Sequence, residues 1–333
     1  MDSVITLDYG SGGKKTAALI DELIVPVLGN TFLNTLSDGA VLPSSGQIVF
    51  STDSFVVSPW RFPGGDIGKL AVCGTVNDVA VSGGRPRFIS LSLILEEGFP
   101  TEDLREILRS LRRTADEAGV KIVTGDTKVV ERGKADGIYI NTSGIGELVC
   151  PGLTPATMRP GDRVLLSGPA GDHGTAVMLA RHSGLLEGEI PSDCGPVHRL
   201  CGSLFALGPS LRVMRDPTRG GIATTLCELA EKTACSVELD EEAVPVRPGV
   251  RSACDLLGLD PLYCACEGRI LAVAAPDAAD EALCRMRELP EGSGAEIIGE
   301  VRESHPGKVC LRTAAGGTRI LTKLSGAQLP RIC

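Results

Sequence analysis

Aromatic residues make up only 3% of the chain, although 43% of its residues are hydrophobic. The core must therefore be built from Leu, Val, Ile and Ala, and 333 residues are enough for two domains. Glycine is abundant instead, with 41 residues. So many glycines indicate tight turns and loops in which the backbone closely approaches a ligand.

The chain also lacks the basic excess of a nucleic-acid-binding protein, since its formal net charge is −9. We expect no general nucleic-acid binding, but backbone N–H groups and metal ions can bind ATP even on an acidic protein. No apolar run approaches the length that spans a membrane. The first residues, MDSVITLDYG, lack the basic start and apolar run of a signal peptide. We expect a cytoplasmic protein without membrane association.

Paired metal ligands are also missing from the sequence. Cys264 and Cys266 form a C-x-C pair, but no second C-x-x-C or H-x-x-x-H pair accompanies them, so we expect no structural zinc. The twelve cysteines are expected to be reduced in a cytoplasmic protein. Most stand singly among Leu, Val and Ala, which is typical of small buried hydrophobic residues.

Strand and helix patterns predict an α/β (α+β) fold. We expect an N-terminal domain at residues 1–150, a C-terminal domain at 151–320 and a flexible tail at 321–333, with the Pro- and Gly-rich stretch 150–162 as linker. Thr101 is the expected N-cap of a helix that ends at Gly119. In the N-terminal domain the predicted helices are 14–28, 65–84 and 101–119, and the predicted strands are 47–57, 87–97, 120–130 and 137–148.

A glycine-rich loop, YGSGGKKT, precedes the first predicted helix. Successive backbone N–H groups and a helix N-terminus can cradle a phosphate group, and a lysine adds positive charge. The loop does not match the Walker A motif, and a plain N-terminal turn remains an alternative. The phosphate-binding residues predicted here are Gly10, Ser11, Gly12, Gly13 and Lys14.

Several aspartates are predicted to lie at strand ends, turns or glycine sites. Carboxylates in such numbers suit Mg²⁺, which is usually bound by a few of them together with nucleotide phosphates. The alternative for each is a turn-capping role. The predicted metal ligands are Asp38, Asp53, Asp78, Asp126 and Asp216, and the predicted nucleotide contacts are Thr52, Asn77 and Lys128.

The sequence motifs and their order resemble those of the HypE family of NiFe-hydrogenase maturation factors, and the resemblance covers essentially the whole chain. The resemblance is carried by GSGGKKTAALIDELI, GDIGKLAVCGTVNDVAVSGGRP, TGDTKVVERGKADGIYINTSGIG, GDHGTAVML, MRDPTRGGIATTL, ACEGRI and the terminal PRIC. Apart from PRIC, these blocks are shared more loosely with aminoimidazole ribonucleotide synthetases, selenophosphate synthetases and thiamine-monophosphate kinases. Tyr9 stands where the family commonly has His.

The resemblance implies a two-domain PurM-like fold whose N-terminal sheets pair into a barrel across a homodimer, with ATP beside that interface. It also implies that Cys333 carries the substrate. The carbamoyltransferase HypF would load this thiol, ATP-dependent dehydration would convert the S-carboxamide into a thiocyanate, and the cyano group would pass to iron on a HypC–HypD complex. Lys128 and Mg²⁺ would stabilise the transferring phosphoryl group, and Glu267 is the candidate base, with a structural carboxylate at a strand start as the alternative.

Two other functions remain open at this stage. One is a selenophosphate synthetase or small-molecule kinase of the same superfamily. Selenophosphate synthetases usually have a cysteine or selenocysteine near the glycine loop, whereas the first cysteine here is Cys73. The other is a nucleotide-binding scaffold without catalytic activity, whose tail only docks partners.

Overall fold

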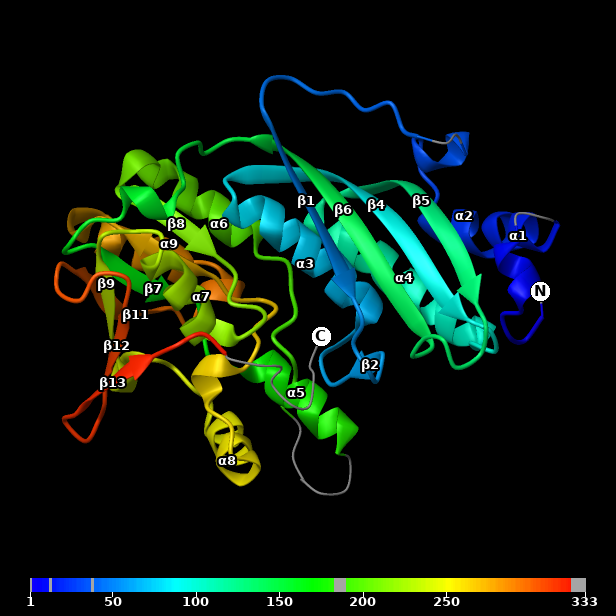
Figure 1. Ribbon diagram of the computed structural model, residues 1–333. Helices are drawn as coiled ribbons and strands as arrows, with labels where there is room; N and C mark the ends of the chain where they lie inside the picture. Colours follow the sequence, from blue (N-terminus) through cyan, green and yellow to red (C-terminus); the bar gives the residue numbers. More distant parts are fainter. Residues whose placement is uncertain (1, 12–13, 37–38, 183–189, 325–333) are drawn as a thin grey trace.

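The computed structural model describes residues 2–11, 14–36, 39–182 and 190–324. It contains two sheets with helices packed on them, which confirms the predicted mixed α/β fold class (Figure 1). The first sheet has the order β1-β6-β4-β5, in which only β4 and β5 run parallel. Its strands are β1 (Ile48–Phe55), β4 (Gly84–Glu96), β5 (Lys121–Val130) and β6 (Ile138–Leu148).

One face of this sheet is covered by α3 (Ile67–Val81) and α4 (Thr101–Ala118). Side chains on successive residues of a strand point to opposite faces, so the burial of β6 alternates along its length. On the face away from α3, Ile48 and Phe50 of β1 remain 51% and 62% exposed. The sheet therefore has one buried face and one partly apolar open face.

The N-terminal segment packs along β5. It consists of η1 (Leu7–Gly10), α1 (Lys14–Leu19), the π turn η2 (Ile20–Ile24), α2 (Val25–Leu28) and η3 (Leu33–Thr35). The sequence predicted one helix at 14–28, but its middle is widened into a π turn, in which Val25 donates to the carbonyl of Ile20. Pro26 has no N–H group and its ring disturbs the preceding turn, which accounts for this wider turn.

The second sheet has the order β13-β12-β9-β11-β7-β10-β8, and only the β12–β9 pair is parallel. Its strands are β7 (Arg163–Leu166), β8 (Leu211–Arg215), β9 (Ser236–Asp240), β10 (Leu271–Ala274), β11 (Glu296–Arg302), β12 (Val309–Arg312) and β13 (Thr318–Leu321). The helices of this half are α5 (Asp172–Arg181), α6 (His198–Leu204), α7 (Gly221–Ala230), α8 (Pro248–Leu257) and α9 (Ala279–Arg287). A short hairpin, β2 (Arg61–Phe62) and β3 (Gly65–Asp66), and the 3-10 turns η4 (Pro155–Thr157), η5 (Phe205–Ser210), η6 (Glu241–Ala243), η7 (Pro261–Tyr263), η8 (Pro276–Ala278) and η9 (Pro290–Gly292) complete the described elements.

Helix α3 joins the two halves of the molecule. Its residues Ala80 and Val81 share a buried cluster with Val197 and Leu200 of the second half, and with Met214 of β8. The packed residues are aliphatic, as the scarcity of aromatic residues predicted. Eleven described cysteines are free thiols, and nine of them are buried, which confirms their interpretation as small core residues.

Several predicted boundaries need correction. Asp53 lies inside β1, not at its end or in the turn after it, because the strand continues to pair beyond it. Helix α4 begins at Thr101, so Pro100 is its N-cap and the predicted N-cap is wrong by one residue, whereas Gly119 adopts the expected left-handed conformation with φ 68°. No helix among the described residues is long and apolar enough to cross a membrane.

We predict that Gly146→Ala lowers the free energy of unfolding by about 1–3 kcal/mol. An added Cβ would lie 2.5 Å from Val79 Cγ1 and 2.6 Å from the carbonyl oxygen of Arg85, so α3 would be pushed away from β6. Gly202→Ala on α6 is the control, since nothing lies within 4 Å of its added Cβ. Urea unfolding checks both, and equal stability of Gly146→Ala and wild type would contradict the prediction.

Candidate functional site

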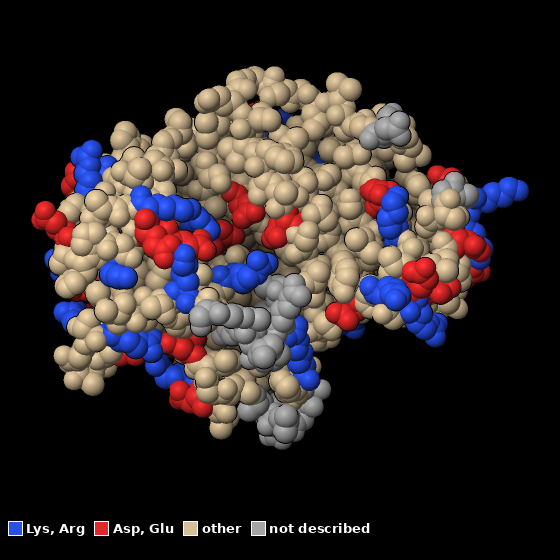
Figure 2. Space-filling model, in the orientation of Figure 1, with Lys and Arg blue, Asp and Glu red and all other residues tan. Residues whose placement is uncertain are grey.

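Carboxyl groups gather where the two halves of the molecule meet. Asp53 comes from β1, Asp78 from α3, Asp216 directly follows β8, and Glu267 lies in the loop before β10. Figure 2 shows acidic side chains beside basic ones near the middle of this face of the molecule. Each of these four groups has a raised pKa, and burial is the main cause in every case.

The carboxyl groups also act on one another. The negative charge of Asp53 raises the pKa of Asp78, and that of Asp78, after burial, helps to raise the pKa of Asp216 to about 7. Glu267 is 5% exposed. Burial is the largest cause that raises its pKa well above the ordinary value, and the negative charges of Cys194 and Asp216 contribute less. Buried carboxylates that repel one another are stabilised by a cation.

Local structure explains why the aspartates face the same space. The pleat of β1 directs Ser51 and Asp53 toward α3, and Ser51 Oγ donates a hydrogen bond of 2.7 Å to Asp78 Oδ2. Thr52, predicted to contact the nucleotide, points to the open face. There its hydroxyl donates to the carbonyl of Thr142 and accepts from Ser143 Oγ.

Two arginines flank Asp216: Arg215 is the last residue of β8, and Arg219 lies in the turn that follows. Arg215 partly offsets the effect of burial on the pKa of Asp78 and Asp216, and Arg219 does so for Asp53. Gly221 begins α7 at φ 61°, and an added Cβ would lie 2.6–2.8 Å from the backbone of residues 262–264. The glycines of the sequence RDPTRGG therefore let this turn lie directly against the loop that carries Glu267.

Asn77, another predicted nucleotide contact, is buried and makes backbone contacts. Its Nδ2 donates to the carbonyls of Gly195 and Glu267 at 3.1 and 3.3 Å, and its Oδ1 accepts from the N–H of Val197 at 2.8 Å. These contacts link α3 to two segments of the second half. They give Asn77 a structural task that its position beside Asp78 did not indicate.

The remaining described candidates lie at the other edge of the first sheet. Gly10 packs on β5, since an added Cβ would lie 2.5 Å from the backbone nitrogen of Val129. Ser11 Oγ donates to the carbonyl of Asp8, and Lys14 is the exposed first residue of α1. On β5 the exposed Lys128 Nζ pairs with Asp126 Oδ2 at 3.0 Å.

Within one chain, the predicted site residues therefore fall into two separate groups. The strand order places β1, which carries Asp53, and β5, which carries Asp126 and Lys128, at opposite edges of the sheet. Gly12, Gly13, Asp38 and Cys333 lie outside the described residues. Within the described part of the chain, no three His, Cys, Asp or Glu side chains form a group that could hold a metal ion. The acidic group is thus not a complete metal site by itself.

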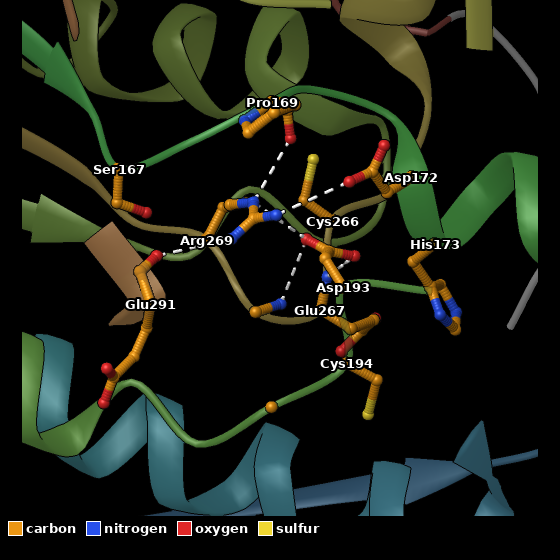
Figure 3. A network of polar contacts seen from close by, with 12 residues as sticks. Ser167, Pro169, Asp172, His173, Asp193, Cys194, Cys266, Glu267, Arg269 and Glu291 are labelled. Atoms are coloured by element: carbon orange, nitrogen blue, oxygen red, sulfur yellow. Dashed lines mark hydrogen bonds and ion pairs between the residues drawn. The ribbon is translucent and has the colours of Figure 1, made fainter. Parts of the chain in front are cut away.

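A buried ionic network behind Glu267 escaped the sequence analysis (Figure 3). Arg269 Nη2 lies 3.4 Å from Asp172 Oδ2, and its Nε lies 3.6 Å from Asp193 Oδ2. Next to Asp172, His173 is fully buried, which lowers its pKa to about 3, and its Nδ1 contacts Ser192 Oγ at 2.9 Å. No sequence motif marks Asp193. The only available sign of a buried ion pair was Arg269, which follows Glu267 and Gly268 in the sequence.

Tyr9, at the position where the HypE family commonly has His, is buried and hydrogen-bonded. Its ring is 3% exposed, and its hydroxyl accepts a hydrogen bond of 3.1 Å from the backbone N–H of Asp2. The ammonium group of Lys15 lies 5.4 Å from the ring centroid. The substitution is thus accommodated by packing at the base of the glycine loop.

We predict that Asp216→Asn makes stability less dependent on pH in the protein without nucleotide or Mg²⁺. A pKa of about 7 means that folded Asp216 retains a proton that the unfolded chain releases near pH 4. Wild-type stability therefore falls as pH rises through this window. Between about pH 5 and pH 8 the variant should lose less unfolding free energy than wild type, by on the order of 2 kcal/mol.

Urea unfolding across this pH range checks the prediction. Asp116→Asn is the control, because Asp116 is exposed, pairs with Arg112 on α4 and does not belong to the acidic group. It should follow the wild-type curve. Parallel curves for wild type and Asp216→Asn would contradict the effect of burial described above.

Comparison with known proteins identifies the family. The N-terminal domain of the AIR synthase related proteins matches residues 36–148, and their C-terminal domain matches residues 159–311. The chain is 49% identical to carbamoyl dehydratase HypE of Cupriavidus necator, over 99% of this chain and 95% of that protein.

Solved structures agree. A crystal structure of the hydrogenase maturation protein HypE in complex with ATP matches with a TM-score of 0.95 and 46% identity, over 98% of this chain and 99% of that one. HypE in a HypE–HypF complex matches with a TM-score of 0.80 and 46% identity, over 92% and 100% of the two chains. These matches confirm the resemblance carried by the sequence motifs and the two-domain fold class: the chain belongs to the HypE family of AIR synthase related proteins.

Proposed function

We propose that this protein dehydrates an S-carbamoyl group on Cys333 to a thiocyanate and uses ATP to do so. The carboxamide oxygen attacks the γ-phosphorus, ADP leaves, and the C–O bond then breaks to release inorganic phosphate. The two protons on nitrogen are lost as the C≡N bond forms. The proposal rests on one observation, the group of buried carboxyls around Glu267, which would combine a place for a cation with a candidate base.

The residues present fit Mg–ATP. Carboxylate oxygens are the ligands that Mg²⁺ prefers, and the charge of Asp53 adds to the effect of burial in raising the pKa of both Asp78 and Asp216. Bound Mg²⁺ would supply charge neutralisation for these carboxylates and for the phosphate oxygens. The family match to a protein crystallised with ATP supports the same assignment.

Glu267 is proposed to accept a proton from the carbamoyl nitrogen. Its raised pKa makes it a strong base once ionised, and positive charge near Asp216 would help it to lose its resting proton. Lys128 is proposed to stabilise the transferring phosphoryl group, together with the glycine loop at residues 10–14. Lys128 lies on β5, at the sheet edge opposite to β1, whose Asp53 belongs to the acidic group around Glu267, so we propose that the two side chains serve one nucleotide from different copies.

A homodimer resolves this separation. If the open faces of two sheets pair, the β5 edge of one copy can lie near the β1 edge of the other, so each nucleotide would contact both copies. The exposed Ile48 and Phe50 on that face support the pairing, because it would bury them. We further propose HypF as the carbamoyl donor, HypC–HypD as the acceptor of cyanide, and a cytoplasmic location. The relative solved in a HypE–HypF complex supports the first of these.

Intact mass spectrometry tests the proposed reaction. The full chain is incubated with the carbamoyltransferase, carbamoyl phosphate and ATP, and should gain one carbamoyl group and then lose one water. Cys333→Ala should gain nothing yet still bind ATP, because the proposed reaction modifies only that thiol. Carbamoylation of Cys333→Ala, or ATP turnover without the modification, would favour a small-molecule kinase or a scaffold instead.

We predict that Asp78→Asn weakens ATP binding about tenfold and that excess Mg²⁺ partly restores it, because one carboxylate is lost from the cation site. Calorimetric titration of wild type and variant, at low and high Mg²⁺, measures the change. Asp116→Asn on α4 should bind as wild type does. An unchanged affinity at both Mg²⁺ concentrations would remove Asp78 from the site.

We predict that two inactive variants complement each other if the site is shared between copies. Lys128→Ala damages the β5 side and Glu267→Gln the other side, so a mixed dimer retains one intact site. Co-expressed in equal amounts, the pair should show about a quarter of wild-type dehydration, since half of the dimers are mixed and each has one working site. Activity no higher than that of either variant alone would place the complete site within one chain.

A further inference from the structure

The backbone of Glu267 is held by a buried carboxylate. Its N–H group donates to Asp193 Oδ1 at 3.2 Å, and the N–H of Gly268 donates to Asp193 Oδ2 at 3.3 Å (Figure 3). The side chain of Asp193 is completely buried. Because both oxygens of one carboxylate accept from adjacent peptide groups, the orientation of the Glu267–Gly268 peptide is fixed.

The carbonyl side of Glu267 is held as well. Asn77 Nδ2 donates to this carbonyl at 3.3 Å from the rigid helix α3, and the N–H of Gly195 donates to it at 3.4 Å. Asn77 also donates to the carbonyl of Gly195 at 3.1 Å. Thus α3, the segment 193–195 and the loop before β10 meet at the peptide groups of one residue.

Close backbone packing reinforces these hydrogen bonds. A Cβ added to Gly268 would lie 1.8 Å from the carbonyl oxygen of Asp193 and 3.2 Å from the backbone nitrogen of Gly195. Real Cβ atoms do not approach oxygen so closely, so only glycine permits this contact. The glycine after Glu267 is therefore part of the same arrangement.

Arginines compensate the buried negative charge. Arg269 is 11% exposed and lies between Asp193 and Asp172, at 3.6 and 3.4 Å. Arg247 Nε lies 3.1 Å from the second of these carboxylates. A buried carboxylate is tolerated only when it is paired and hydrogen-bonded, and Asp193 has both kinds of partner.

We propose that Asp193 and Asn77 are positioning residues that fix Glu267 for proton abstraction during dehydration. The inference rests on the proposed role of Glu267 as base. Both residues contact its peptide groups directly, from opposite sides and from different segments of the chain. A displacement of about 1 Å at a reacting group can slow a reaction on the order of a hundredfold, so such fixing has a catalytic consequence beyond stability.

The test uses S-carbamoylated full-length protein and measures the first-order rate of dehydration as ATP is varied. Asp193→Asn preserves the size of the side chain but removes its charge and one acceptor. Its rate at saturating ATP should fall about ten- to a hundredfold, while KM for ATP stays within about twofold, because the displaced group does not bind nucleotide. Carbamoyl loading should be unchanged.

Asp162→Asn is the matched control. Asp162 is also a buried aspartate, lies 3.2 Å from Arg212 Nε and accepts the backbone N–H of Arg159 at 2.7 Å, but it belongs to the turn before β7. This variant should lose stability yet keep the wild-type rate and KM. If Asp193→Asn does not fold, Asn77→Ala loosens the same peptide from the other side and should give the same separation of rate and KM.

The outcomes distinguish this proposal from the proposed function. If Glu267→Gln is inactive but Asp193→Asn and Asn77→Ala dehydrate at the wild-type rate, Glu267 remains the base and the positioning role is refuted. Equal losses in Asp193→Asn and Asp162→Asn would also refute it, since any buried aspartate would then have the same effect. If Glu267→Gln dehydrates normally, the base assignment fails and the positioning role fails with it.

Discussion

The burial of several carboxyl groups close to one another is the constraint on which this structure depends. Asp53, Asp78, Asp216 and Glu267 come together where α3 meets the second sheet, and burial raises the pKa of each. Such an arrangement lowers the stability of the protein above neutral pH and is relieved when a cation binds. The carboxylate oxygens explain why a hard cation with a phosphate ligand is the proposed occupant, and burial, more than repulsion, explains why Glu267 can be a strong base.

The rest of the fold holds these groups in place. Aliphatic packing around Ala80 and Val81 fixes α3 between the two sheets, and Asn77 on that helix reaches the peptide of Glu267. Arg269 neutralises the second layer of buried acids behind it. Gly10 packs on β5 and Lys128 belongs to it, so both lie at the far edge of the first sheet, which is why we propose a site shared between two copies.

Much of this architecture could be predicted from sequence, because apolar periodicity reports which residues are buried. The helices around 65–84 and 101–119 and the four strands of the first sheet follow from it. Periodicity does not show how distant segments meet. Asn77 was predicted to contact a nucleotide, and its hydrogen bonds to backbone groups 118 and 190 residues away could not be predicted from the sequence. Asp193 was missed because its partners are peptide N–H groups, which leave no trace in the residue pattern.

The central claim is that the carboxamide oxygen leaves as phosphate, and an isotope measurement tests it most directly. The protein is carbamoylated on Cys333 with a heavy isotope of oxygen in the carbonyl position, and a single round of dehydration is started with unlabelled ATP and Mg²⁺. Mass spectrometry of the released inorganic phosphate should then show one heavy oxygen atom for each thiocyanate formed. Phosphate without the label, with the heavy oxygen found in water, would contradict transfer of the phosphoryl group to the carbamoyl oxygen.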